Sequence, residues 1–213
     1  MNVRDGEYLR PTPFIDCDHP SIGIKAGDLT AQTDTIPEKV KRLFYFVRDS
    51  IKYNPYAEKN SPEFYITSRV LSQGEGYCVQ KAALLCSLAR AVGIPSRLGF
   101  ADIRNHLVPE KLANMIKTDI FTFHGYTEFL IEGKWVKATP AFDINMCEKN
   151  HIIPVEFDGE NDAVFHKFNR DGKLHIEYLD DLGRYSDIPL KEILESFTRT
   201  YGSADPGHRS DSR

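Results

Sequence analysis

The sequence has no apolar run that approaches the ~18 residues a membrane-spanning helix requires. Its first seven residues include no apolar segment of the kind found in secretory signals. It has no excess of basic residues either, and a net charge of −4 argues against general nucleic-acid binding, which needs a basic surface. We therefore expect a cytoplasmic protein with neither a nucleic-acid nor a membrane partner; the oligomeric state stays open.

Cysteine is also scarce, and its four positions exclude two further kinds of protein. Cys17, Cys78, Cys86 and Cys147 form no CxxC pair, which fits a reducing compartment better than a disulfide framework. Cys78 and Cys86 would lie about 12 Å apart along one helix, too far to bridge. The adjacent Cys-Asp-His at 17–19 has poor spacing for metal ligands. We expect no metal site and no cofactor, and we interpret Cys86 as a buried core thiol.

What is present is an ordinary globular composition, with enough apolar residues for one sizeable core and an appended subdomain. We divide the chain into N-terminal strands and loops (1–35), a core domain (36–145), a C-terminal extension with a β-hairpin and a helix (146–201), and a disordered tail (202–213). Proline and glycine among short apolar pieces lead us to expect one or two short strands before residue 31.

Two helices are marked clearly. Thr35 and Glu38 form a capping-box pattern, with Pro37 in the first turn, ahead of a helical apolar stripe that ends at 54–55. A second stripe begins at Cys78, and Gly93 stands where a C-terminal glycine cap belongs.

Strands alternate with turn signals later in the chain. The expected elements are a strand at 97–101, a helical turn at 110–116 over a cleft, a hairpin of 121–131 and 134–138, a second hairpin of 163–168 and 174–179 turning at 170–172, and a helix at 190–201. Alternation in the first hairpin places His124 on the face opposite the apolar layer.

Cys78 is the strongest candidate for chemistry. It follows Gly74 and Gly76, which can supply a tight turn, and it lies in the first turn of its helix. The unsatisfied N–H groups and the dipole there favour an anion, so we expect a lowered thiol pKa. His124 on a strand can take the thiol proton and later give it to a leaving amine. The alternative is a small buried cysteine at a helix start and a surface histidine.

Four motifs, in order and with compatible spacing, carry a resemblance over residues 38–143. Residues 44–53 (FYFVRDSIKY), 74–97 (GEGYCVQKA…LARAVGIPSR), 124–128 (HGYTE) and 133–136 (GKWV) resemble segments of the transglutaminase-like superfamily. The resemblance implies a papain-like α+β fold, with the nucleophile helix packed on an antiparallel sheet. It also implies a Cys-His-Asp triad acting on glutamine or other amides, with a peptide or protein amide as substrate.

The third triad member departs from the family pattern. The family's acid stands four residues after the tryptophan and before a proline, where this chain has Thr139 ahead of Pro140. Asp143 is the nearest acid. A threonine hydroxyl can accept a hydrogen bond from the ring, but it cannot stabilise an imidazolium as a carboxylate does. Either Asp143 folds back to orient His124, or Thr139 does so.

The oxyanion of the reaction would need two donors. The Cys78 backbone N–H is one candidate because it lies at a helix start, and Gln73 or Tyr53 is the other. We expect a thiol enzyme that hydrolyses or transfers an amide or peptide acyl group through a thioester. The alternative is a non-catalytic peptide- or protein-binding domain that keeps the cleft.

Overall fold

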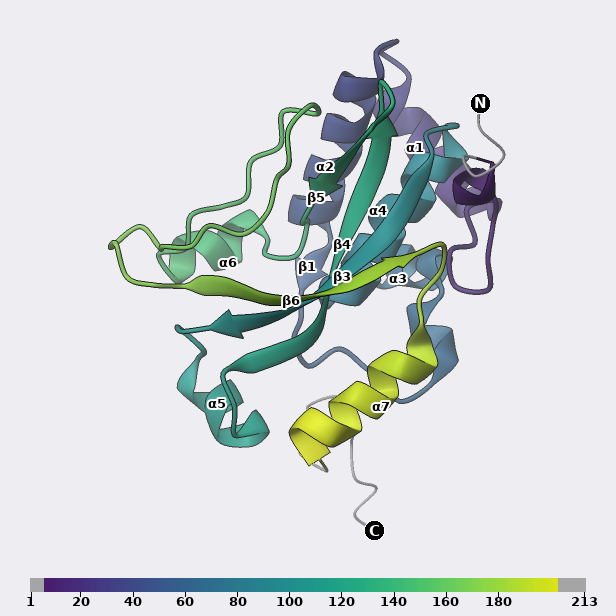
Figure 1. The fold of residues 1–213 in the computed structure, drawn as a ribbon. Helices are drawn as coiled ribbons and strands as arrows, with labels where there is room; N and C mark the ends of the chain where they lie inside the picture. Colours follow the sequence, from purple (N-terminus) through teal and green to yellow (C-terminus); the bar gives the residue numbers. More distant parts are fainter. Residues whose placement is uncertain (1–5, 203–213) are drawn as a thin grey trace.

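A four-stranded antiparallel sheet packs on a layer of helices in the computed structural model, which describes residues 6–202 (Figure 1). The sheet has the order β5-β4-β3-β6, formed by β3 (Ser96–Asn105), β4 (Ile120–Ile131), β5 (Lys134–Ala138) and β6 (Ile176–Tyr185). A short parallel pair joins β1 (Lys52–Tyr53) to β2 (Glu75–Gly76). The α-helices are α1 (Pro20–Thr30), α2 (Ile36–Ser50), α3 (Thr67–Gln73), α4 (Cys78–Ala91), α5 (Glu110–Ile116), α6 (Ile144–Lys149) and α7 (Leu190–Tyr201).

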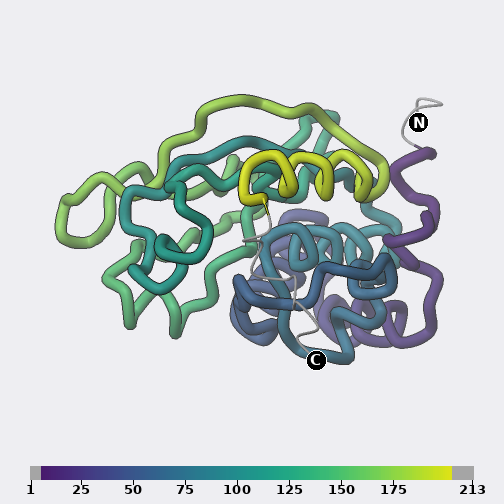
Figure 2. Tube along the Cα trace, turned by 90° about the horizontal axis from the view of Figure 1, so that it is seen from below, coloured from purple at the N-terminus to yellow at the C-terminus, as the bar shows by residue number. Residues whose placement is uncertain are grey.

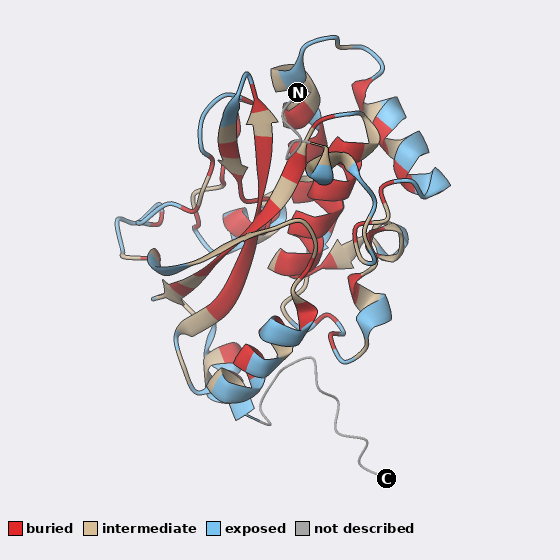
Figure 3. Ribbon diagram, turned by 45° about the vertical axis from the view of Figure 1, so that its right-hand side comes forward, coloured by how far each residue is buried: buried red, intermediate tan, exposed pale blue. Residues whose placement is uncertain are grey.

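Helix α4 is the central element between the two layers. The purple and blue helical segments form one layer and the green strands another (Figure 2), and buried residues concentrate where the layers meet (Figure 3). Gly125 of β4 allows this contact, since a Cβ there would lie 3.1 Å from the Val79 Cα. The Thr127 hydroxyl donates to the Ala82 carbonyl at 2.8 Å. The expected α+β architecture, with the Cys78 helix packed on an antiparallel sheet, is confirmed.

Glycines on either side of α4 adopt the backbone conformations that the sequence predicts. Gly74 ends α3 with a φ of 69°, a left-handed conformation that favours glycine. At the other end, Gly93 has a φ of 77°, its N–H donates to the Arg90 carbonyl, and the Ile94 N–H reaches the Ala89 carbonyl. This is the predicted glycine cap, in the form of a Schellman motif.

The expectation of strands before residue 31 is wrong, because residues 20–30 form helix α1. His19 caps this helix through a Ser21 N–H to Nδ1 contact, and Pro20 occupies the first helical position. Ile22, Ala26 and Thr30 then bury one face at a spacing of four residues. Burial against the helical layer outweighs the weak helix propensity of the glycines between them.

Helix α2 begins at Ile36 as expected, and its buried positions follow the predicted stripe. The capping-box expectation is wrong, however, since the Thr35 side chain makes no capping hydrogen bond. The Glu38 carboxylate instead pairs with Lys41, one turn further along, at 2.6 Å.

The first predicted hairpin is confirmed as β4 and β5, with Glu132 and Gly133 at positive φ in the turn. The second predicted hairpin does not form as a pair of strands. Residues 163–168 form no strand, and the two arms are joined by one β-bridge, between Phe168 and Leu174, and by the Phe165 N–H, which donates to the Tyr178 hydroxyl. The later arm becomes β6, which pairs with β3 at the sheet edge. The turn at 170–172 does form, with Gly172 at a φ of 73°. The disordered tail predicted at 202–213 lies, beyond Gly202, outside the described residues.

Candidate active site

Cys78 opens α4 directly after the glycine turn. A Cβ on Gly76 would lie 3.0 Å from the Gln80 Cβ, so the turn packs tightly on the first helical turn. The Tyr77 N–H donates to Gln80 Oε1, and Gln80 Nε2 donates to the Phe64 and Glu58 carbonyls. These bonds fix the start of the helix against the preceding loop and hold Cys78 in place.

Cys78 is the one cysteine of the four with appreciable exposure, since Cys17, Cys86 and Cys147 are buried. The expected lowering of its pKa is wrong. Burial raises the pKa of the Cys78 thiol, although the backbone N–H groups of Gly125 and Val79, and the Lys59 charge, oppose the rise. The helix terminus acts in the predicted direction, but desolvation outweighs it. The resting group is a neutral thiol.

His124 lies on β4 and is 3% exposed. Its ring stands 4.8 Å from the ring of Phe165 and 6.2 Å from that of Tyr178. His124 therefore lies on the expected face, opposite Gly125 and Thr127, which contact α4, but this face is covered as well. The alternative of a surface histidine is wrong. Burial lowers the pKa of His124 to about 3, which keeps the imidazole neutral. Within the described chain, Nε2 of this ring makes no hydrogen bond.

An irregularity in β4 lies directly before His124. The register with β3 shifts between Ala101 and Ile103, and Phe123 adopts a φ of 52°. The Asp102 carboxylate stabilises the distortion by accepting from the Phe123 N–H and the Thr122 hydroxyl. Strict alternation of side chains fails at this point, as expected at a β-bulge.

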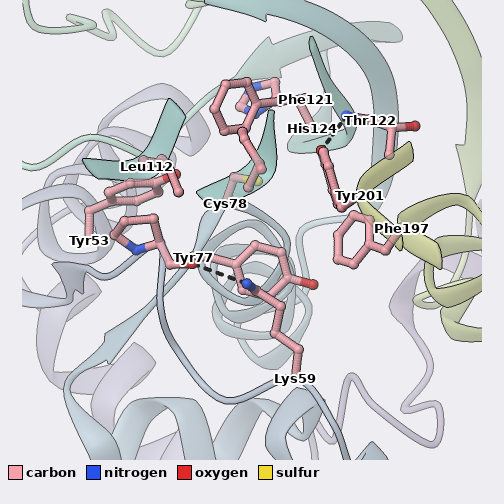
Figure 4. A pocket seen from close by; sticks show the side chains of 12 residues that line it. Tyr53, Lys59, Tyr77, Cys78, Leu112, Phe121, Thr122, His124, Phe197 and Tyr201 are labelled. Atoms are coloured by element: carbon pink, nitrogen blue, oxygen red, sulfur yellow. Dashed lines mark hydrogen bonds between the residues drawn. The ribbon is translucent and has the colours of Figure 1, made fainter. Parts of the chain in front are cut away.

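Cys78 and His124 line the same cleft, which encloses about 490 Å³, part of it open to solvent. Its labelled lining residues in Figure 4 are Tyr53, Lys59, Tyr77, Cys78, Leu112, Phe121, Thr122, His124, Phe197 and Tyr201. Across residues 6–202, no hydrogen bond joins the Cys78 sulfur to His124. The two predicted reacting groups thus meet at one cleft without a direct bond between them.

The structure does not place Asp143 on His124. One Asp143 oxygen accepts the Tyr53 N–H at 2.9 Å, and the other accepts the Met146 N–H at 2.8 Å, capping α6. Asp143 also faces Lys81, which is fully buried and donates to the Arg48 and Ile51 carbonyls. Burial lowers the pKa of Lys81 to about 7, and Asp143 is the group that most opposes this fall. Asp143 therefore stabilises the wall of the cleft.

Thr139 is 1% exposed and follows β5. Extending the β4–β5 register from the Thr127–Ala138 pair places Thr139 opposite Tyr126, on the same face as His124. Its Oγ1 makes no hydrogen bond within the described residues. It lies near the Tyr178 hydroxyl, however. Burial raises the pKa of Tyr178, and the nearby Thr139 hydroxyl offsets part of this rise.

Gln73 and Tyr53, the two candidates for the second oxyanion donor, differ in their distance from the site. Cys78 and His124 also line a second hollow, together with Phe142 and Phe165. Gln73 is exposed at the end of α3 and lines neither this hollow nor the cleft. Tyr53 lines both, and its ring packs edge-on against Phe142 at 5.0 Å. Burial raises the pKa of the Tyr53 hydroxyl well above its usual range, so this group keeps a proton that it can donate.

Sequence reasoning missed the wall formed by α7. Phe197 and Tyr201 line the cleft, and the Tyr201 hydroxyl accepts the Thr122 N–H at 2.9 Å. The apolar stripe of α7 marked it as a packed helix but gave no indication of where it packs. Helix α5, expected to lie over a cleft, does so through Leu112 and Ile116.

A helix-borne cysteine that shares a cleft with a strand-borne histidine is the arrangement that a thiol acyl-transfer site requires. The family profile described as the transglutaminase-like superfamily matches residues 25–140, more than half of the chain. The chain belongs to this superfamily. No curated protein matches it significantly.

Two solved structures are similar. One, from Cytophaga hutchinsonii, is described as a putative cysteine protease; it has a TM-score of 0.52 and 12% identity, covering 87% of this chain and 55% of that one. The other, from Parabacteroides distasonis, is described as a putative protease; it has a TM-score of 0.39 and 21% identity, covering 56% of this chain and 23% of that one. The chain thus spans about half the length of the first structure. The first likeness shows that the two proteins share a fold. None of the helices in residues 6–202 has the length and apolar character needed to cross a bilayer.

Proposed function

We propose that the protein is a thiol enzyme that hydrolyses or transfers an amide or peptide acyl group. The observation that carries the proposal is the cleft shared by Cys78 and His124, with Cys78 the only cysteine of the four that is more than marginally exposed. The family membership supports it. The substrate is a peptide or protein amide.

The reaction begins from neutral groups. Cys78 Sγ attacks the carbonyl carbon, an S–C bond forms, and the thiol proton passes to His124. The carbonyl oxygen becomes an oxyanion, for which the Cys78 N–H and the Tyr53 hydroxyl are the donors. The C–N bond then breaks, and the amine leaves with the proton from His124. Water or an amine attacks the thioester and gives its proton to His124. The C–S bond then breaks, the acyl product leaves, and the Cys78 sulfur takes the proton back from His124.

Because His124 is buried, its protonated ring is a species of high free-energy cost in this reaction. Lowering the His124 pKa from 6.5 to about 3 corresponds to about 5 kcal/mol against the protonated ring. Thr139 is our candidate for orienting the ring, because it is on the His124 face with an unused hydroxyl. A hydroxyl offers less compensation than a carboxylate, so we expect slow turnover.

Thiol labelling tests the proposal. Iodoacetamide at pH 7, followed by peptide mapping, should modify Cys78 before the other three cysteines in the folded protein. Amide hydrolysis should disappear in Cys78→Ala and fall strongly in His124→Gln. Modification of Cys17 or Cys147 while Cys78 stays intact would remove the basis for a reactive thiol at this site.

The second candidate function is a peptide-binding domain without chemistry. The observation that favours it is the engagement of both Asp143 oxygens by backbone N–H groups, which leaves His124 without a carboxylate. This alternative predicts that peptides bind the cleft, that no thioester forms, and that Cys78→Ala binds as tightly as the wild type.

A further inference from the structure

A further hollow, which we call the basic groove, adjoins the second of the two hollows that contain Cys78 and His124. It encloses about 910 Å³, part of it open to solvent, between α6 with the residues that follow it, the turn at 169–173, and residues 105–109. Asn105, Pro109, Phe142 and Met146 line both the basic groove and the hollow that holds Cys78 and His124. The two hollows therefore share part of their lining and lie side by side.

The rim of the basic groove carries unbalanced positive charge. Lys149 and Lys173 are exposed and have no ion pair within the described residues. Asp171, the acid that lines the groove, contacts His151 Nδ1 at 3.3 Å. With neutral histidines, these groups leave one net positive charge, in a chain whose total is −4.

The inner wall carries an unused polar atom. His175 is 1% exposed, its ring lies nearly parallel to that of Phe142 at 6.2 Å, and its Nε2 makes no hydrogen bond among residues 6–202. Burial lowers its pKa to about 4, so the ring is neutral near pH 7 and can donate or accept one hydrogen bond. A buried polar group without a partner is costly, and a hydrogen bond to a bound ligand is one way to satisfy it.

We propose that the basic groove binds a carboxylate of the peptide substrate while the scissile amide lies at Cys78. The proposal rests on the proposed function, since it specifies the substrate class of the same cleft. One net positive charge matches a single carboxylate better than a phosphate dianion. Lys149 and Lys173 supply the attraction, and the Phe142–Met146 segment packs against the chain that connects the carboxylate to the amide.

The carboxylate can come from an acidic side chain or from a free C-terminus, and two peptide sets distinguish these sources. The first places Glu, or Gln as its neutral counterpart, at successive positions of fluorescent C-terminally amidated peptides. The second compares free-acid with amidated peptides that lack acidic side chains. Binding to the full-length protein is followed by fluorescence polarisation, which requires no reactive thiol.

In wild type at low salt, we expect the carboxylate peptide to bind about three- to tenfold more tightly than its neutral counterpart. The ratio should fall below about twofold in the Lys149→Gln/Lys173→Gln double variant, and in wild type at high salt. Lys134→Gln, which removes an exposed lysine at the β4–β5 turn, is the matched control and should keep the wild-type ratio.

A ratio near one in wild type for both peptide sets, or a ratio that the double variant leaves unchanged, would overturn the proposal. A parallel set of the same peptides bearing a chloroacetamide group reports on Cys78 separately. If the thiol is not alkylated but the charge-dependent binding persists, the proposed function fails and the groove assignment stands. If Cys78 is alkylated but the peptides show no charge preference, the groove assignment fails and the proposed function stands.

Discussion

Replacing Asp143 distinguishes a stabilising carboxylate from a catalytic one. In Asp143→Ala, α6 loses its N-cap, at about 0.5–2 kcal/mol, and the Tyr53 N–H loses its acceptor, at about 1–3 kcal/mol. We therefore expect a loss of about 2–4 kcal/mol in the free energy of unfolding. For a chain of this size that corresponds to a fall of roughly 5–15 °C in Tm.

Asp143→Asn is the matched control. Its amide oxygen can still accept one of the two N–H groups, and asparagine is a good N-cap, so the expected loss is about half as large. Urea unfolding followed by the fluorescence of Trp135, the single tryptophan, measures both variants. Cys78-dependent amide hydrolysis, assayed well below the lowered Tm, should stay within about threefold of wild type.

A triad role predicts the reverse pattern. Removing the group that orients a catalytic histidine costs ~10⁴ in rate, with little necessary change in stability. An Asp143→Ala protein with wild-type unfolding but with hydrolysis reduced by several orders of magnitude would refute our assignment of Asp143 to the cleft wall.

Three further predictions concern pH and packing. Because the pKa values of His124 and His175 are lowered, the unfolded chain binds more protons than the folded chain between about pH 6.5 and 4. The free energy of unfolding is therefore greatest above pH 6.5. Below that pH it falls by up to about 1.4 kcal/mol per pH unit for each histidine. Urea unfolding at stepped pH should show this, with a shallower slope in His175→Gln; an unchanged slope would contradict it. Lys81, with a pKa of about 7 when folded and about 10.5 when unfolded, makes stability rise between pH 7 and 8.5, and Lys81→Met should lose that rise in the same measurement. Gly99→Ala should destabilise by about 1–3 kcal/mol because its Cβ would lie 2.4 Å from a tyrosine ring of β4, whereas Gly27→Ala, in open space on α1, should stabilise by about 0.5–1 kcal/mol; equal Tm values for the two would refute this packing argument.

The elements that could be predicted from sequence are those whose signals are local. The glycine turn before Cys78, the cap at Gly93 and the turn at Glu132 and Gly133 depend on the conformations of a few adjacent residues. The course of α4 and the β4–β5 hairpin followed from them. Helix α1 was missed because its glycines resemble loop residues, while its burial depends on the rest of the helical layer.

The site required long-range information that no local pattern contains. His124 is buried by Phe165 and Tyr178, which follow it by 41 and 54 residues, so the alternation of β4 could not indicate its surroundings. The helix start at Cys78 indicated the direction of one electrostatic effect, but desolvation by the packed sheet decided the balance. Asp143 could have reached His124 or the backbone N–H groups that it binds. Which of these it meets depends on where the chain turns after Pro140. The domain boundaries and the cytoplasmic location stay predictions.

Helix α7 has a consequence for how selectivity can diverge within the family. It contributes Phe197 and Tyr201 to the cleft, yet it lies beyond residues 25–140, the part that matches the family profile. The basic groove also draws most of its charged residues from beyond that part. The proposed nucleophile and its proposed base are therefore encoded in one segment, and most of the walls around them in another. Exchange of the C-terminal segment between homologues could give new substrate preferences to an inherited reaction, without altering Cys78 or His124.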